Sequence, residues 1–110
     1  MAATYKNARI QGTSSVTSYS NLYTVPSGKS AVISTLSIVN ASTADITYRI
    51  AIVNSDITPT ATDWIVFDSV VSANDGTHLT LGITLTAGQI LKVSSSSTSS
   101  VFWCFLSEIS

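Results

Sequence analysis

Apolar and polar residues alternate along several short stretches of the chain, most clearly between Ile46 and Asn54. Ile46, Tyr48, Ile50 and Ile52 fall on one side of that stretch, and the residues between them fall on the other. A period of two is typical of a β-strand that buries one face. No segment of useful length shows the longer period of an α-helix, so the pattern predicts an all-β protein.

The stretch from Leu22 to Asn40 predicts two strands joined by a turn. A short strand, Leu22 to Val25, meets the turn residues Pro26-Ser27-Gly28, and a β-branched strand from Lys29 to Asn40 follows. Pro presets the backbone for a turn, and Gly adopts conformations that other residues avoid. The rest of the chain is organised around this stretch.

Two strands allow their faces to be assigned by alternation. In residues 29–40, Val32, Leu36 and Ile38 share one face and Ile33 lies on the other. Neither face is strictly polar, as expected for a strand covered on both sides. The last strand, residues 101–109, has Val101, Trp103 and Phe105 on one face; the other face carries Phe102, Cys104 and Leu106.

Turn signals recur at intervals of about ten residues, which is typical of a sandwich or barrel. Asn40 to Asp45 and Ser72 to Gly76 are turns of the kind that joins paired strands of a hairpin. Further strands are predicted at residues 8–11, 64–71, 78–85 and 90–95. A serine-rich tip spans residues 94–100.

These elements predict about eight strands in an antiparallel β-sandwich of the jelly-roll type, a fold that typically has eight strands. The immunoglobulin-like alternative lacks its mark, a pair of cysteines around a tryptophan. We expect residues 1–12 to form an N-terminal arm and residues 13–110 to form a single β-sandwich domain. A chain of 110 residues is long enough for one domain with a core.

The composition favours a protein that works in an assembly. Charged residues make up 10% of the chain, whereas 20 serines and 15 threonines supply most of its polar groups. So few charges give little repulsion between copies, so association is expected. The five basic residues are scattered, which argues against direct nucleic-acid binding. No secretory signal or membrane span is visible, so synthesis in a cytoplasm is expected.

No catalytic, cofactor-binding or metal site is predicted. His78 has no partner that spacing identifies, and no nucleophile elbow occurs. Asp63, Asp68 and Asp75 could supply carboxylates to one loop end, but they are better explained as turn and cap residues. The single Cys104 excludes an internal disulfide and is expected to be buried.

Three further side chains stand out. Trp64 and Trp103 could together form a platform on which a carbohydrate stacks, although a place in the core or in a subunit interface suits their apolar strands better. Arg49 is a lone charge within an apolar strand. It either faces solvent or sits in an interface and pairs with an aspartate such as Asp68, and the sequence leaves both possibilities open.

The stretch LYTVPSGKSAVISTLSIVN, residues 22–40, resembles the opening "LYTVPAGKxAvvsxixixN" of small structural proteins from tailed bacteriophages, including cyanophages. The resemblance continues through ITYRIAIVN (46–54), LTLGITLTAGQILKVSSSS (79–97) and the terminal SEI (107–109). Ser27 replaces the alanine common in the turn. The resemblance lies in strands and turns, so it carries over no catalytic residue.

The resemblance implies a virion structural protein without cofactors, most favourably a capsid decoration (cement) protein. Such a protein would be a homo-oligomer, with a trimer as one form, and would bridge major capsid subunits. The alternatives are a tail, neck or fibre component and a carbohydrate- or receptor-binding module of the virion. That module would use Trp64, the loop from Asn54 to Asp63 and the serine tip.

Overall fold

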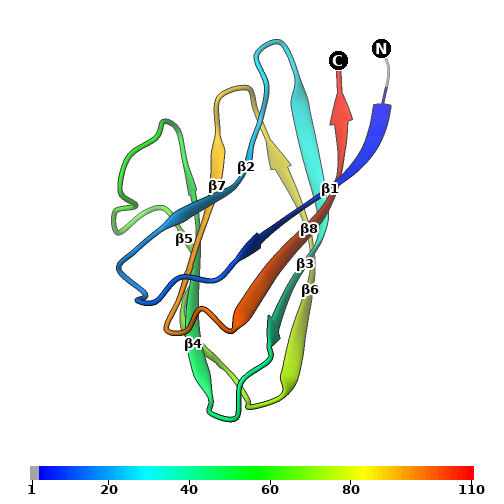
Figure 1. Cartoon of the computed structure of the whole chain (residues 1–110). Helices are drawn as coiled ribbons and strands as arrows, with labels where there is room; N and C mark the ends of the chain where they lie inside the picture. The colour runs from blue at the N-terminus through cyan, green and yellow to red at the C-terminus, as the bar shows by residue number, and fades with distance from the viewer. Residues whose placement is uncertain (1–2) are drawn as a thin grey trace.

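The computed structural model describes residues 3–110 and shows two four-stranded antiparallel sheets, with no helix among those residues (Figure 1). The first two residues of the predicted arm (1–12) lie outside the described part. The strands are β1 (Ala3–Gln11), β2 (Ser20–Thr24), β3 (Ser30–Asn40), β4 (Ile46–Val53), β5 (Trp64–Val71), β6 (Asp75–Leu85), β7 (Ile90–Ser95) and β8 (Ser100–Ile109). The all-β prediction is confirmed.

The strands form sheet A in the order β1-β8-β3-β6 and sheet B in the order β2-β7-β4-β5. Only β4 and β5 are both consecutive in the chain and paired with each other. Each of the remaining connections therefore crosses from one sheet to the other. The two predicted hairpin turns, residues 40–45 and 72–76, are both such crossings, so the hairpin interpretation was wrong at both places.

Asn40 explains why the first of these turns does not close a hairpin. Its side chain is buried, and its amide nitrogen lies 2.9–3.1 Å from the carbonyl oxygens of Ala44, Val71 and Ser72. Its amide oxygen accepts hydrogen bonds from the backbone and hydroxyl of Ser42. The Asn40 amide thus links the connection after β3 to the connection after β5, because it donates hydrogen bonds to carbonyl oxygens at both places.

The core lies between the sheets and draws on both. Phe102 of β8 and Tyr48 of β4 meet edge to face across it, with ring centres 6.3 Å apart. The other buried residues of this cluster are Leu22, Val25, Ala31, Ile33, Leu36, Ile38, Ile46, Ile50, Val71, Leu85, Leu91, Val93, Cys104 and Leu106. Cys104 is buried as predicted, and burial raises the pKa of its thiol to about 11.

The alternation predicted for β3 fails at a bulge. Ile33 pairs with Leu106 and Thr35 with Phe105, so Ser34 is an extra residue in β3 relative to β8. The bulge shifts the side-chain pattern by one position. The core therefore receives Ile33 together with Leu36 and Ile38, whereas strict alternation had placed Ile33 on the opposite face. The alternation predicted for β8 holds.

The N-terminal strand is longer than the predicted residues 8–11. Residues 3–11 form β1, and each of them pairs with a residue of β8 at one edge of sheet A. In the described part of the chain this segment is thus a strand of the sheet. The boundary between a 1–12 segment and a 13–110 domain remains a prediction. Among residues 3–110, no helix could cross a membrane.

Candidate functional site

The two tryptophans lie in different sheets, so they do not form one platform. Trp103 belongs to β8 of sheet A and faces outward, opposite the buried neighbours Phe102 and Cys104. Trp64 begins β5 of sheet B. Each has its own aromatic and arginine neighbours. The structure therefore has two candidate surfaces, one on the outer side of each sheet.

Arg49 lies at the centre of the surface on sheet B. It donates two hydrogen bonds to Asp68, from Nε to Oδ1 at 2.6 Å and from Nη2 to Oδ2 at 3.1 Å. Its Nη1 donates to the hydroxyl of Tyr19 at 3.1 Å. The guanidinium carbon lies 4.1 Å from the ring centre of Phe67 and 5.5 Å from that of Trp64. Of the two possibilities for Arg49, the structure shows the pairing with Asp68.

A bulge in β5 positions the carboxylate of this pair. Tyr48 pairs with Ser69 and Ile50 pairs with Val66, so β5 has one more residue than β4 between these two pairs. Asp68 has φ of 54° there, a left-handed conformation that is uncommon for residues other than glycine. The hydrogen bonds from Arg49 hold the pKa of the Asp68 carboxyl below its usual range. Strict alternation along β5 could not reveal this arrangement.

The Arg49 cluster leads to a first stability prediction. We expect Arg49→Ala to lower Tm by roughly 5 °C or more, because it removes three hydrogen bonds and two aromatic contacts. Lys92→Ala should lower Tm by less, since the Lys92 ammonium has one ion-pair partner, Asp56 at 2.7 Å. Thermal unfolding of both variants by circular dichroism measures the difference. Equal Tm values for the two variants would contradict the role given to Arg49. Arg49→Lys should recover little of the lost Tm, because lysine lacks the planar guanidinium group that binds both oxygens of a carboxylate.

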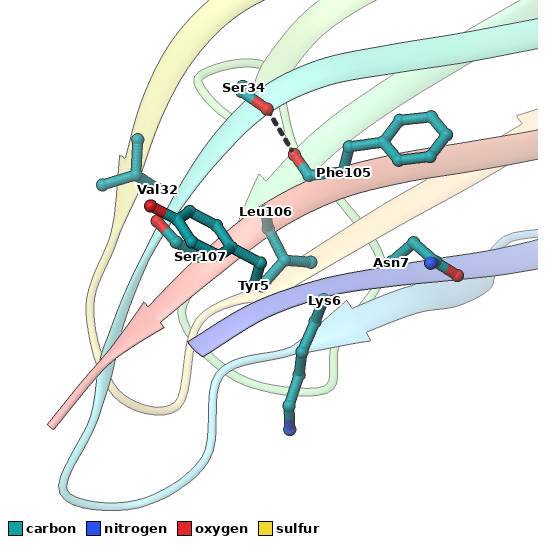
Figure 2. Close-up of a pocket in the computed structure, with 8 residues that line it drawn as sticks. All are labelled: Tyr5, Lys6, Asn7, Val32, Ser34, Phe105, Leu106 and Ser107. Atoms are coloured by element: carbon teal, nitrogen blue, oxygen red, sulfur yellow. Dashed lines mark hydrogen bonds between the residues drawn. The ribbon is translucent and has the colours of Figure 1, made fainter. Parts of the chain in front are cut away.

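The surface on sheet A centres on Trp103. The Arg9 guanidinium lies 5.2 Å from the Trp103 ring centre on one side, and the Phe105 ring runs parallel to Trp103 with its centre 6.1 Å away. Tyr5 is 87% exposed and Phe105 is 40% exposed. A hollow of about 380 Å³ opens on this face and is lined by residues of β1, β8 and β3: Tyr5, Lys6, Asn7, Phe105, Leu106, Ser107, Val32 and Ser34 (Figure 2). Figure 2 also shows Tyr5 and Lys6 pointing to opposite sides of β1.

The other residues singled out in the sequence have hydrogen-bond partners within their own turns or strand pairs. His78 Nδ1 lies 2.8 Å from the Ser37 hydroxyl, a partner on the neighbouring strand that spacing could not identify. Asp63 accepts hydrogen bonds from Thr60 in a turn, and Asp68 pairs with Arg49. Within residues 3–110 no group of three or more metal-ligating side chains comes together.

The serine tip and the loop at residues 54–63 lie at opposite ends of sheet B. Tyr48 pairs with Ser95 near the tip, and Val53 pairs with Ile90 near the loop. Ser94, Ser95 and Ser100 are buried. The Ser95 and Ser100 hydroxyls bond to each other at 2.9 Å. These hydroxyls stabilise the fold, so the tip does not join the loop in one receptor site.

A buried carboxylate lies at the end of the sandwich where β1 begins and β8 ends. Glu108 of β8 is 3% exposed and accepts a hydrogen bond from the Tyr23 hydroxyl at 2.5 Å. Its Oε1 lies 2.9 Å from Lys6 Nζ and 3.6 Å from Lys29 Nζ. Hydrogen bonds from Tyr23 and Lys6 lower the pKa of Glu108, while burial and the bond to Glu108 raise the pKa of Tyr23. We name this group the Glu108 cluster.

One solved structure has a similar fold over the whole chain. It is described as the "Acidic stable capsid structure of Helicobacter pylori bacteriophage KHP30". The superposition has a TM-score of 0.53 at 13% sequence identity, and it covers 100% of this chain and 94% of that chain. No protein-family model and no curated protein matches the chain. At this identity the similarity establishes a shared all-β fold.

Proposed function

We propose that this protein is a structural component of a bacteriophage virion, specifically a capsid decoration (cement) protein that bridges major capsid subunits. The observation that carries the proposal is the fold shared with a chain of a phage capsid structure over nearly the full length of both chains. A fold alone does not define a function. Here the family resemblance of residues 22–40 points to the same class of protein independently.

The strand orders support a jelly roll within this proposal. β1-β8-β3-β6 faces β2-β7-β4-β5, and the chain crosses between the sheets at all connections except the one from β4 to β5. Two sheets of four strands built from Greek keys define the jelly roll, which is common in viral capsid domains. We assign the fold to that type.

The surface also suits a permanent assembly. Four of the five basic residues form ion pairs inside the chain: Lys6, Lys29, Arg49 and Lys92. The outer faces of both sheets instead present aromatic rings with an arginine against them. Aromatic residues and arginine are enriched in protein interfaces. A homo-oligomer that also contacts the major capsid protein would use both faces.

The same geometry weakens the carbohydrate alternative. A sugar ring stacks on the open face of an aromatic ring, but the guanidinium groups of Arg49 and Arg9 lie against the rings of Trp64 and Trp103. Glycan binding that disappears in Trp64→Ala would nevertheless restore that alternative.

Localisation in the intact particle tests the proposal. Cryo-electron microscopy of purified virions should show the chain on the outer capsid surface, bridging capsid subunits. Gel densitometry of the same virions should give hundreds of copies per particle, and heads stripped of tails should retain them. A count of tens of copies that leave with the tails would replace the decoration role by a tail, neck or fibre role.

A further inference from the structure

The two sheets have four edge strands, β1 and β6 in sheet A and β2 and β5 in sheet B. Bulges interrupt three of them: β2 at residues 21–23, β5 around Asp68 and β6 around Gly82. A bulge bends an edge strand and breaks the row of backbone groups with which another strand could pair. Strand β1 instead pairs with β8 residue for residue from Ala3 to Gln11. Of these four edges, β1 is the regular one.

The hydrogen bond from Gly12 N to Ser100 O, at 2.7 Å, fixes the direction of the backbone groups along β1. Gly12 continues the register of this strand, in which Gln11 pairs with Val101. Residues of an antiparallel pair alternate between those that bond to the neighbouring strand and those that face away from it. The even-numbered residues of β1 therefore bond to β8, and residues 3, 5, 7, 9 and 11 direct their N–H and C=O groups outward. No other strand within residues 3–110 pairs with this row.

We propose that β1 pairs antiparallel with β1 of a second copy of the chain, about a two-fold axis through Asn7. Such an axis, perpendicular to the sheet, joins sheet A of one chain to sheet A of the other and keeps both outer faces on one side. Residue 3 then lies opposite residue 11 of the second copy, and residue 5 lies opposite residue 9. Every outward-directed residue of β1 meets another, so about ten backbone hydrogen bonds can form.

The side chains select this register over its neighbours. An axis through Lys6 would set the two Lys6 side chains opposite each other, and an axis through Arg9 would do the same with the two arginines. An axis through Ala8 leaves Ala3 without a partner on the other strand. The axis through Asn7 uses the whole strand, and it places no like charges directly opposite each other, an arrangement that would destabilise the pair.

Tyr5 and Arg9 favour a second copy as the partner, because this register brings them together twice. The Tyr5 side chain is 87% exposed, and Arg9 forms no ion pair within residues 3–110. The Arg9 guanidinium already lies 5.2 Å from the ring centre of Trp103, its partner on β8. In the dimer, Tyr5 of the second copy lies on the other side of Arg9. Each arginine then has an aromatic ring on both sides, a favourable arrangement for a cation.

Lys6 does not prevent this pairing. A lysine on an edge strand usually discourages the approach of another strand. Here the Lys6 ammonium lies 2.9 Å from Glu108 Oε1 of its own chain, and Figure 2 shows Lys6 and Tyr5 pointing to opposite sides of β1. The charge of Lys6 is therefore compensated, and its aliphatic stem lies opposite Ala8 of the second copy.

The interface is small, so we expect a weak dimer. A strand of nine residues is roughly 30 Å long and a sheet is about 10 Å thick, which gives roughly 300 Å² per partner in projection. Standard interfaces bury about 800 Å² per partner. We therefore expect a dissociation constant on the order of 100 μM, at which about a quarter of the chains are dimeric at 20 μM and about four fifths at 1 mM.

Amide exchange measured by NMR on the full chain tests both the dimer and its location. In the monomer, the amides of Tyr5, Asn7 and Arg9 face solvent, and those of Lys6 and Ala8 bond to β8. Raising the concentration from about 20 μM to 1 mM should slow exchange at the first three amides by about threefold to fivefold. Exchange at the other two amides should change little, because they are protected in both states.

Two substitutions at the axis separate backbone pairing from side-chain contact. Asn7→Pro removes an outward N–H without breaking a bond to β8, and proline is tolerated at such edge positions. It should weaken the dimer by at least about tenfold, since two hydrogen bonds are lost and each proline ring occupies the place of the other strand. Asn7→Ala is the matched control, because it keeps the N–H, and it should leave the dissociation constant within about threefold of the wild type.

A charge test at Tyr5 identifies the register. Tyr5→Glu should tighten the dimer by about threefold to tenfold, because it adds two pairs with Arg9 of the other copy, and Tyr5→Lys should weaken it similarly. In an Arg9→Ala background the two variants should bind equally. Within one chain these positions lie about 13 Å apart along β1, beyond the screening length at physiological salt.

Four results would overturn the proposal: no slowing of exchange at the three outward amides up to 1 mM, a self-association that protects another edge or face instead, a dimer that Asn7→Pro leaves intact, or equal affinities for Tyr5→Glu and Tyr5→Lys. Protection of these amides only in the assembled particle would replace the second copy by a strand of another protein. Circular dichroism melts of each variant exclude unfolding as the cause of a change. Neither the dimer nor its tests depend on the virion role, and absence from purified heads would overturn the decoration role alone.

Discussion

Gly12→Ala should destabilise the protein by about 3 kcal/mol and lower Tm by roughly 10–20 °C. A β-carbon at this position would lie 1.8 Å from Ser100 Oγ, 2.4 Å from Ser95 Oγ and 2.9 Å from the carbonyl oxygen of Ser97. These distances are far below van der Waals contact, and one of the three atoms belongs to the backbone. The structure must therefore open at this point.

The neighbours of Gly12 cannot move freely because they are bonded to each other. Thr13 and Ser95 exchange hydrogen bonds, from the Thr13 amide to Ser95 Oγ at 3.0 Å and from the Ser95 amide to Thr13 Oγ1 at 2.8 Å. Ser100 Oγ donates to the Ser97 carbonyl at 2.8 Å. Moving either serine away from a new methyl group would break such bonds inside the protein, at a cost of about 1 kcal/mol or more each.

Urea unfolding of Gly12→Ala and Gly28→Ala separates crowding from backbone strain. Gly28 has φ of 77°, and no atom lies within 4 Å of the place that a β-carbon would take, so Gly28→Ala should cost only about 1–2 kcal/mol. In a Ser100→Gly background, Gly12→Ala should cost less than in the wild type, because the shortest contact is gone. Equal costs for the two glycine variants would contradict the crowding explanation.

Glu108→Gln should lower the free energy of unfolding by about 2 kcal/mol at pH 7. The substitution keeps the shape of the side chain but removes the charge that Lys6, Lys29 and the Tyr23 hydroxyl face. These partners come from β1, β2 and the turn before β3, so the Glu108 cluster holds both sheets together at one end. Urea unfolding at a series of pH values measures the effect.

The pH dependence of this difference has a definite sign. The folded-state pKa of Glu108 lies below its ordinary value of 4.5, so the wild type gains stability from this carboxylate above pH 4.5 and loses it as the pH falls through the folded-state pKa. The difference in the free energy of unfolding between the wild type and Glu108→Gln should therefore be constant near neutral pH and become smaller as the pH is lowered. A gap of the same size at pH 3 and pH 7 would show that the charge of Glu108 contributes nothing.

At alkaline pH, the dependence of stability on pH has the opposite sign. The pKa of Tyr23 is raised in the folded state above its ordinary value of 10.0, so its contribution is complete below pH 10 and declines as the pH rises further. Stability from the Glu108 cluster should thus be flat between about pH 5 and pH 9.

Local patterns in the sequence located the strands well. The alternation predicted at residues 46–54 corresponds to β4, which ends one residue earlier at Val53, and the run at 64–71 is β5. In the last strand, the apolar residues Phe102, Cys104 and Leu106 face the core as their period of two predicts. Strand formation depends on neighbours within a few residues, and the face assignment of β8 holds because no bulge interrupts its pairing with β1.

The candidate surfaces were only partly predictable. The sequence allows Asp68 as a partner of Arg49, and the structure shows that pair. Tyr19 and Phe67 complete the cluster from a loop and from a bulged strand, and Arg9 meets Trp103 across a strand pair. A bulge changes the facing of side chains without a marked sequence signal, and a cross-strand contact depends on the register of pairing.

The sequence by itself determined that the chain is all-β, where most of its strands lie, and that it carries few charges. Only the tertiary structure decided which strands pair. The turns at residues 40–45 and 72–76 have the residues of hairpin turns, yet each leads into the opposite sheet. A short turn with these residues can join two paired strands of one sheet or lead from one sheet to the other, because its local chemistry is the same in both cases. The choice comes from contacts between residues far apart in the chain, such as β1 with β8 and Asn40 with Val71.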